Sequence, residues 1–179
     1  MAGAFTVVAK IDDREIMAAL DRMSRQARRL SPAWKNIGEA LLRSTQQRFH
    51  LQQDPEGHRW QRLKDSTKAS KAARGYDPRK ILTMRGQLRD SIRYQADDGG
   101  VRIGTNLIYA AIHQFGGKTR AHVIKPKNKK ALAWPGGRHP VRSVNHPGSN
   151  IPARPFLGIS RQDRDRILEV VADHLGMNG

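Results

Sequence analysis

The chain has 179 residues, enough for one domain with a hydrophobic core and too few to expect two. It has no cysteine, which excludes disulfides and thiolate metal sites, and no run of about 20 apolar residues that could span a bilayer. Its formal charge of +17 at pH 7 predicts attraction to polyanions, whether nucleic acid or acidic protein surfaces.

The first third of the chain predicts one strand and two helices. Residues 5–11 (FTVVAKI) are apolar and β-branched, which favours a strand. Residues 12–30 repeat apolar side chains every three or four positions, with acids at the start and arginines at the end, as in an amphipathic helix. Ser31 and Pro32 are typical of an N-cap and a first helical position, so a second helix should reach about residue 50. Its buried face would comprise Trp34, Ile37, Leu41 and Phe49.

The middle of the chain predicts short helices separated by turns. After a turn at residues 54–57, the lysine-rich pattern of residues 60–73 indicates a helix closed by Gly75. A second short helix is expected over residues 81–93 and a third over residues 106–115. Between them, RYQA and VRIG flank the turn residues DDGG, which predicts a β-hairpin.

The last third predicts a basic arm and a closing helix. No Asp or Glu occurs over residues 99–162, which hold eleven Lys or Arg. Within this span, brief extended runs joined by Pro, Gly and Asn predict a long, basic β-hairpin arm over residues 118–150. Ser160 followed by Asp163 is typical of a helix N-terminus, and Gly176 of its end.

These elements predict a single α+β domain over residues 1–179. It would combine N-terminal helices, a short antiparallel sheet, the projecting arm and a C-terminal helix. The first ten residues lack a basic segment followed by an apolar run, so we expect synthesis in the cytoplasm and no contact with a membrane.

Three separated clusters carry a family resemblance. The first has the pattern D-x2-G-x2-W-x2-L-x3-T-x3-K and comprises Asp54, Gly57, Trp60, Leu63, Thr67 and Lys71. The second lies within residues 81–116 and includes VRIGT and YAAIHQFG, and the third is IPARPFLG at residues 151–158. In this order and spacing they resemble the phage virion morphogenesis family, which includes Mu-like G proteins and P2-like tail completion proteins.

The resemblance implies a structural, non-enzymatic protein of the phage neck that acts at the head–tail junction or the tail end. It implies a homo-oligomeric ring around the DNA channel, with a hexamer as the expected number and other neck and tail proteins as partners. It implies no cofactor, no metal and no small-molecule substrate, and it places the finished protein in the virion.

The segment at residues 151–158 is a candidate docking element. Its two prolines stiffen an extended backbone, while Phe156 and Leu157 can fill an apolar pocket and Arg154 can reach an anion. An interface role was therefore expected for Arg154, Pro155, Phe156 and Leu157, together with Trp134, Tyr109 and Phe115. The alternative is a linker that packs within its own subunit before the last helix.

The histidines give weak signals for chemistry. Tyr109 and His113 lie one helical turn apart, but no nearby carboxylate in the sequence orients the imidazole, which favours a packing role. The irregular spacing of His122, His139 and His146, without Cys, Asp or Glu, speaks against zinc. We therefore expect no catalytic, cofactor or metal-binding residues.

The arm has two possible partners, and the alternative is a solvated, flexible loop without a partner. Its cations could meet acidic faces of a neighbouring subunit, or they could touch DNA phosphates without reading the sequence. These candidate contacts are Lys125, Lys127, Lys129, Lys130, Arg138 and Arg142. Trp134 is more suited to hydrophobic anchoring than to stacking, because a duplex offers few free bases. The alternative function is a non-specific nucleic-acid-binding protein in phage DNA handling, which would bind duplex DNA with a steep salt dependence.

Overall fold

The computed structural model describes residues 30–177 except 129 and 134–138, together with five isolated positions near the N-terminus. Those five are Ala18, Asp21, Arg22, Ser24 and Arg25. All five are helical, in agreement with the helix predicted over residues 12–30. The strand predicted at residues 5–11 lies outside the described residues.

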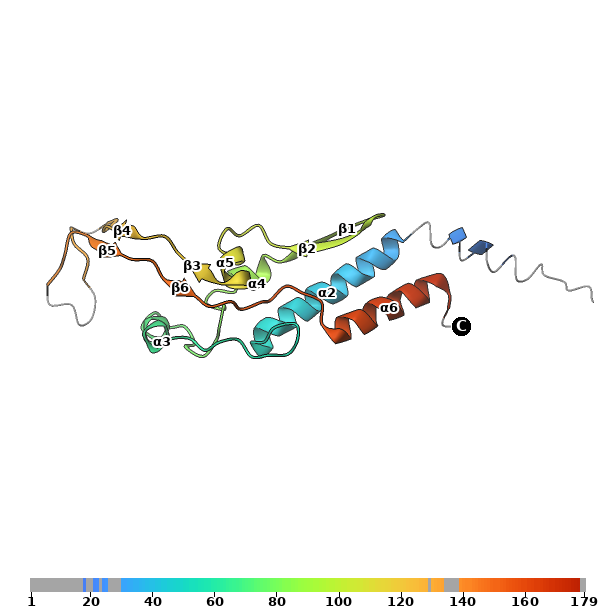
Figure 1. The fold of residues 1–179 in the computed structure, drawn as a ribbon, viewed down its shortest axis with the longest axis horizontal. Coiled ribbons are helices and arrows are strands. Elements are labelled where there is room, and N and C mark those ends of the chain that lie inside the picture. The colour runs from blue at the N-terminus through green and yellow to red at the C-terminus, as the bar shows by residue number, and fades with distance from the viewer. Residues whose placement is uncertain are drawn as a thin grey trace, which may run out of the picture.

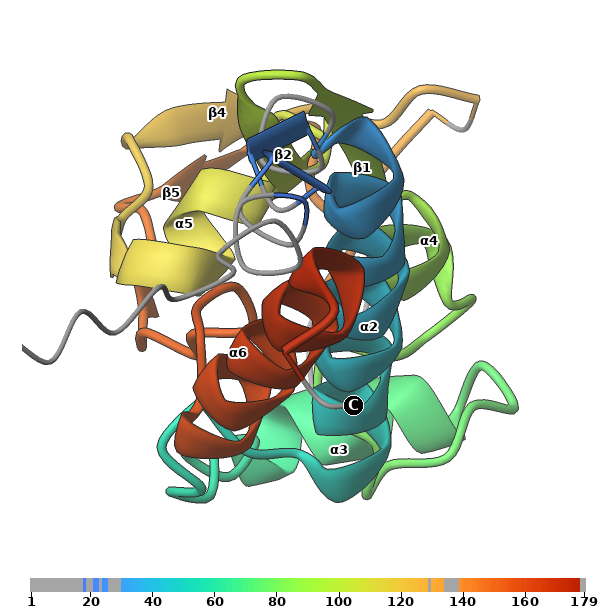
Figure 2. The same ribbon diagram turned by 90° about the vertical axis from the view of Figure 1, so that its right-hand side faces the viewer.

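The described chain is a mixed α+β domain built around one long helix (Figure 1). Its elements in order are α2 (Ser31–Leu51), α3 (Asp65–Ala72), α4 (Gln87–Asp90), β1 (Arg93–Asp97), β2 (Gly100–Gly104), α5 (Ala110–Phe115), β3 (Gly117–Lys118), β4 (His122–Ile124), β5 (Val144–His146), β6 (Asn150–Ile151) and α6 (Arg161–Leu175). Helix α6 and the β1–β2 hairpin both pack against α2 (Figure 2). The predicted α+β class is confirmed.

Helix α2 follows the sequence prediction except at its first residue. Its N-cap is Leu30, no side chain caps it, and Pro32 lies in the first turn, so the capping role predicted for Ser31 is wrong. Ile37, Leu41 and Phe49 are buried as predicted, while Trp34 is only half-buried. The predicted face is therefore the one that packs against the rest of the domain.

Two of the predicted short helices are much shorter than the local pattern indicated. The helix expected over residues 60–73 begins only at Asp65, because the preceding residues are held extended by tertiary contacts. The indole of Trp60 donates a hydrogen bond to the carbonyl oxygen of Pro155 over 2.9 Å and is 4% exposed. Burial of this side chain across the core outweighs the helical propensity of the residues that follow it.

The helix expected over residues 81–93 is reduced to the single turn of α4. Leu82 has a φ of 52° and Gly86 one of 77°, so the backbone is left-handed at both positions and cannot continue a helix. The backbone N–H of Ile81 donates instead to the Gln52 side chain over 2.6 Å. The helix expected over residues 106–115 is likewise confined to α5.

The two predicted hairpins are confirmed. Strands β1 and β2 pair antiparallel in the register Arg93↔Gly104 to Asp97↔Gly100. The arm is an interrupted antiparallel hairpin in which β3 pairs with β6 and β4 with β5, and Leu132 bridges Val141 further out. Figure 1 shows it extending away from the end of the domain where α2 begins and α6 ends.

Helix α6 has the ends that its sequence predicted. Ser160 and Asp163 form a capping box, and Gly176 closes the helix in the left-handed conformation with a φ of 70°. No helix among the described residues is both long and apolar enough to cross a membrane.

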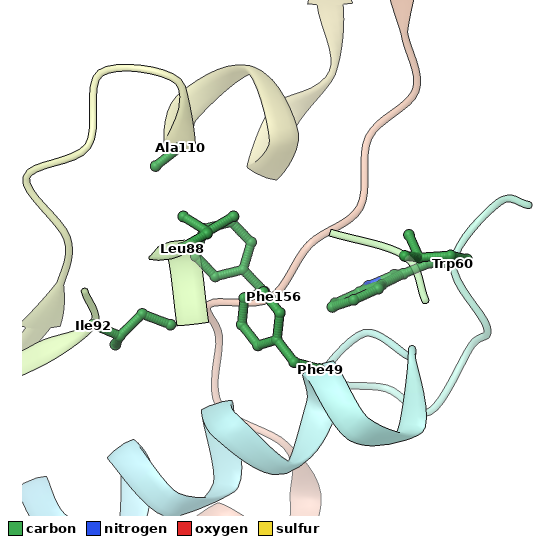
Figure 3. Close-up of a cluster of buried hydrophobic side chains, with 7 residues drawn as sticks. Phe49, Trp60, Leu88, Ile92, Ala110 and Phe156 are labelled. Atoms are coloured by element: carbon green, nitrogen blue, oxygen red, sulfur yellow. The ribbon is translucent and has the colours of Figure 1, made fainter. Parts of the chain in front are cut away.

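Two adjacent hydrophobic clusters form the core. One lies where α2 ends and consists of Phe49, Trp60, Ile81, Leu88, Ile92, Ala110 and Phe156 (Figure 3). The other joins α2 to α6 and consists of Ala33, Ile37, Leu41 and Val170. The first cluster holds residues from six separate stretches of the chain, so it fixes the position of the segment that contains Phe156.

Candidate assembly surfaces

The segment at residues 151–158 is held inside the subunit by one glutamine. The Gln114 side-chain oxygen accepts hydrogen bonds from the backbone N–H groups of Phe156 and Leu157, both over 3.0 Å. Its amide nitrogen donates to the Leu157 carbonyl oxygen over 2.9 Å. These three bonds substitute for the partners that a neighbouring strand would supply, so the segment is satisfied without another subunit.

A buried arginine fixes the same segment from the opposite side. Arg48 on α2 donates to the carbonyl oxygens of Phe156 and Gly158 over 3.0 and 2.8 Å. Its Nη2 also lies 2.5 Å from Oδ2 of Asp163, the residue that caps α6. Both charged side chains are nearly fully buried. Arg48 therefore ties α2, the 151–158 segment and the start of α6 together.

Phe156 is a core residue of its own subunit. It has no exposed surface, and its ring centroid lies 5.4 Å from that of Phe49 (Figure 3). A fully buried side chain cannot contact another subunit unless the core opens. The intermolecular role expected for Phe156 is therefore corrected, and the alternative of intramolecular packing describes this residue.

Arg154 is also turned inward. The residue is 6% exposed, and its Nε donates to the carbonyl oxygen of Gln61 over 3.0 Å. Its backbone N–H donates to the carbonyl oxygen of His113 over 2.8 Å. Among the described residues no carboxylate pairs with it. Pro155 and Leu157 remain half-buried. Of the four residues expected to form an interface here, these two retain accessible surface.

Exposed apolar side chains gather around α5 instead. Ile108 immediately before the helix is 99% exposed, Phe115 at its end is 78% exposed, and Tyr109 is 42% exposed. We call Ile108, Tyr109 and Phe115 the α5 patch. Clustered exposed apolar groups are typical of surfaces that bind another protein. Tyr109 and Phe115 were predicted from the sequence as interface residues. Ile108 was not, because an apolar residue within a predicted helix gives no sign of its exposure.

The arm presents its cations to solvent. Lys125, Lys127, Lys130 and Arg142 are all exposed, and no Asp or Glu lies in this part of the sequence to pair with them. Lys129, Trp134 and Arg138 lie outside the described residues. The described cations can therefore contact either acidic protein or phosphate, as the sequence allowed.

The histidines of the arm and of α5 are positioned by packing. His122 and His146 face each other across β4 and β5 with ring centroids 5.2 Å apart. Tyr109 and His113 meet edge to face at 6.0 Å. Burial and the nearby charge of Arg154 lower the pKa of His113 below its ordinary value of 6.5, so the ring is neutral at pH 7.

One metal-type cluster occurs among the described residues, in the turn after α2. Potential ligand atoms of Asp54, Glu56 and His58 lie within 4.8 Å of one another. However, Oδ1 of Asp54 already accepts the backbone N–H groups of Glu56 and His58, which shapes the turn. The cluster is largely exposed and does not include the histidines of the arm.

The described domain thus combines a hydrophobic core, exposed apolar side chains around α5 and a projecting basic arm, which are features of a protein that acts by assembling with others. Comparison with known proteins agrees. Residues 11–176 match the phage virion morphogenesis family, and the chain belongs to this family of structural phage proteins. This confirms the resemblance found in the sequence.

Two relatives cover almost the whole chain. The putative capsid assembly protein G of Escherichia phage Mu is 32% identical over 163 residues, which are 90% of this chain and 88% of the relative. The Mu-like prophage FluMu G protein 2 of Haemophilus influenzae is 29% identical over 161 residues, covering 90% and 89%. No solved structure matches the chain.

Proposed function

We propose that the chain is a structural subunit of a homo-oligomeric ring at the neck of a tailed phage, at the head–tail junction or the tail end, surrounding the DNA channel. Membership of the phage virion morphogenesis family supports a role in virion assembly, as does the capsid assembly named for the Mu relative. The finished protein would then be part of the virion and would act without catalysis or a cofactor.

The observation that carries the proposal is the α5 patch beside the base of the arm. Helix α5 leads directly into β3, so Phe115 at the end of the helix lies next to the base of the arm. On β4 in the arm, Val123 and Ile124 are also exposed, at 53% and 37%, and as neighbours on a strand they lie on opposite faces. In a ring each subunit uses one surface to bind a different surface of its neighbour, and this face would provide one half of that contact.

Substitutions in the patch test the proposal. Ile108→Asp combined with Phe115→Asp should abolish oligomers in size-exclusion chromatography with light scattering, while the far-ultraviolet circular dichroism spectrum stays that of the folded protein. The control is Leu51→Asp, which places an acid on an exposed apolar residue outside the patch, 47% exposed at the end of α2. If the double variant forms the same oligomer as the unchanged protein, the α5 patch is not the subunit contact.

The acid-free arm also favours a second candidate, a protein that binds nucleic acid without sequence preference in phage DNA handling. Each neutralised phosphate releases a counterion, so four arm cations on duplex DNA would give a slope of about −3.6 in a plot of log K against log salt. Binding that is weak at physiological salt, in protein with the arm intact, would exclude this candidate and leave the arm to contact protein.

A further inference from the structure

A groove of about 740 Å³ lies beside the base of the arm, between α3, the 80–88 segment and residues 149–154. Six cations line it, and none of its lining residues is an Asp or Glu. The six are Arg62, Lys64, Lys71, Lys80, Arg85 and Arg154. Its apolar part includes Leu82, Met84 and Ile151. The lining therefore matches a ligand that carries both carboxylates and apolar side chains.

Two of these cations are buried without an acidic partner. Lys71 is 6% exposed and donates to the carbonyl oxygens of Lys80 and Thr83, and Arg154 is equally buried and donates through Nε to a carbonyl oxygen. The terminal nitrogens of Arg154 have no hydrogen-bond partner among the described residues. The terminal nitrogens of Arg154 therefore remain open to solvent, where an anion that enters the groove can pair with them.

Three acids in the segments that border the groove are already engaged, and one of them, Asp90, pairs with Arg89 at 2.7 Å. Asp65 pairs with Lys68 at 2.8 Å, and Asp77 pairs with Arg79 at 3.2 Å. His113, which also lines the groove, has a buried Nδ1 without a hydrogen-bond partner among the described residues. Among the described residues, no acid forms an ion pair with the cations that line the groove, so they are available to an anionic ligand.

The N-terminal part of the sequence has the complementary chemistry. Residues 5–9 are the run FTVVA, and residues 10–16 contain three acids (Asp12, Asp13 and Glu15) and two bases (Lys10 and Arg14), which leaves a net charge of −1. Helix α2 has 21 residues, about 30 Å of length, and begins at the end of the molecule remote from α3 and the arm (Figure 1). The start of α2 therefore lies far from the groove of its own subunit.

We propose that the groove binds residues 5–16 of a second copy of this chain, with their carboxylates on its cations and their apolar side chains against Leu82 and Met84. Tyr109 belongs to both the groove and the α5 patch, so the contact continues the surface proposed above. The proposal rests on the ring function, because a head-to-tail arrangement brings one end of each subunit to the opposite end of the next.

The test measures binding of a fluorescent peptide of residues 3–17 to the full-length protein. The protein carries Asp12→Asn, Asp13→Asn and Glu15→Gln, so that its own N-terminal segments should not occupy the groove. Fluorescence anisotropy should show binding of the peptide. The same three substitutions in the peptide should weaken binding by about tenfold or more, because each loses a charge-assisted hydrogen bond. Equal binding of both peptides would overturn the proposal.

Matched protein variants locate the site. Arg62 and Arg85 are both exposed on the rim of the groove. Arg62→Gln combined with Arg85→Gln should weaken binding of the peptide by about tenfold or more. Arg142→Gln with Arg164→Gln removes the same charge from exposed sites outside the groove and should change the affinity less than about twofold. Equal losses in the two pairs, or a duplex DNA ligand that binds the groove in place of the peptide, would contradict the proposal.

Measuring both peptide binding and oligomer formation distinguishes a failure of the groove proposal from a failure of the proposed ring. If the unchanged protein forms closed oligomers but the peptide does not bind, the groove proposal fails and the proposed function stands. If the peptide binds as expected but no oligomer forms at any concentration, the segment occupies the groove of its own subunit, and both the second-copy proposal and the ring are wrong.

Discussion

Arg48 and Asp163 form a buried ion pair across 115 residues of sequence, with 2.5 Å between Nη2 and Oδ2. The same carboxylate accepts the backbone N–H and the hydroxyl of Ser160 at the start of α6. The same guanidinium donates to the carbonyl oxygens of Phe156 and Gly158. One pair thus closes the domain around its core.

Removing one partner of this pair should destabilise the subunit strongly. Asp163→Asn leaves the Arg48 charge buried without a carboxylate and weakens the cap of α6. The free energy of unfolding should fall by about 3 kcal/mol or more in urea denaturation at one fixed protein concentration. Arg43→Gln is the control, because it breaks an exposed pair with Glu39 and should cost less than about 1 kcal/mol. Comparable losses would show that the buried pair has no special role.

The free energy of unfolding should also depend on pH through the carboxyl group of Asp163. Burial by itself raises the pKa of its carboxyl, but hydrogen bonds from Ser44 and Ser160 and the charge of Arg48 hold it below the ordinary value of 3.8. A pKa lowered by folding stabilises the folded state above the unfolded pKa, and this contribution is lost as the pH falls through the folded pKa. The urea midpoint should therefore drop below about pH 4. This drop should be smaller in Asp163→Asn, and an unchanged pH profile would contradict the assignment.

Gly38 marks the closest approach of α2 to β1. A Cβ at this position would overlap the ring of Tyr94, so Gly38→Ala should lower the free energy of unfolding by about 1–3 kcal/mol despite its better helix propensity. Tyr94→Ala should remove most of this penalty in the double variant, and a thermodynamic cycle measures the coupling. Additive effects would mean that the two residues do not compete for space.

The fully buried Phe156 ring gives a prediction about folding rather than assembly. Phe156→Ala should leave a cavity beside Phe49 and lower the free energy of unfolding by about 3–5 kcal/mol. Phe156→Asp should prevent folding, whereas an exposed docking hook would have left a soluble monomer. A folded, monomeric Phe156→Asp protein, shown by circular dichroism and light scattering, would restore the interface role of this residue.

The sequence predicted the elements whose signals are local. The β1–β2 hairpin follows from the turn residues between two short strands, and α6 follows from Ser160, Asp163 and Gly176 at its ends. The arm was visible from its composition. Each of these needs only residues within a few positions, or within one hairpin, to be recognised.

The sequence could not predict contacts between distant segments. Residues 151–158 are held in place by contacts with Arg48, Trp60 and Gln114, which lie between 42 and 110 residues away along the chain. Until those partners are known, a Phe-Leu-Gly sequence after two prolines fits an exposed docking segment and a segment packed in the core equally well. Ile108 in the α5 patch and the groove were also missed, because exposure and concavity arise only from the folded chain.

Electron microscopy of the purified full-length protein tests the central claim most directly. We expect rotationally symmetric rings with a central opening and one subunit number, six by analogy with the family, with the arm of each subunit against its neighbour. Particles that remain single subunits at every concentration, or that grow as open filaments, would contradict the account.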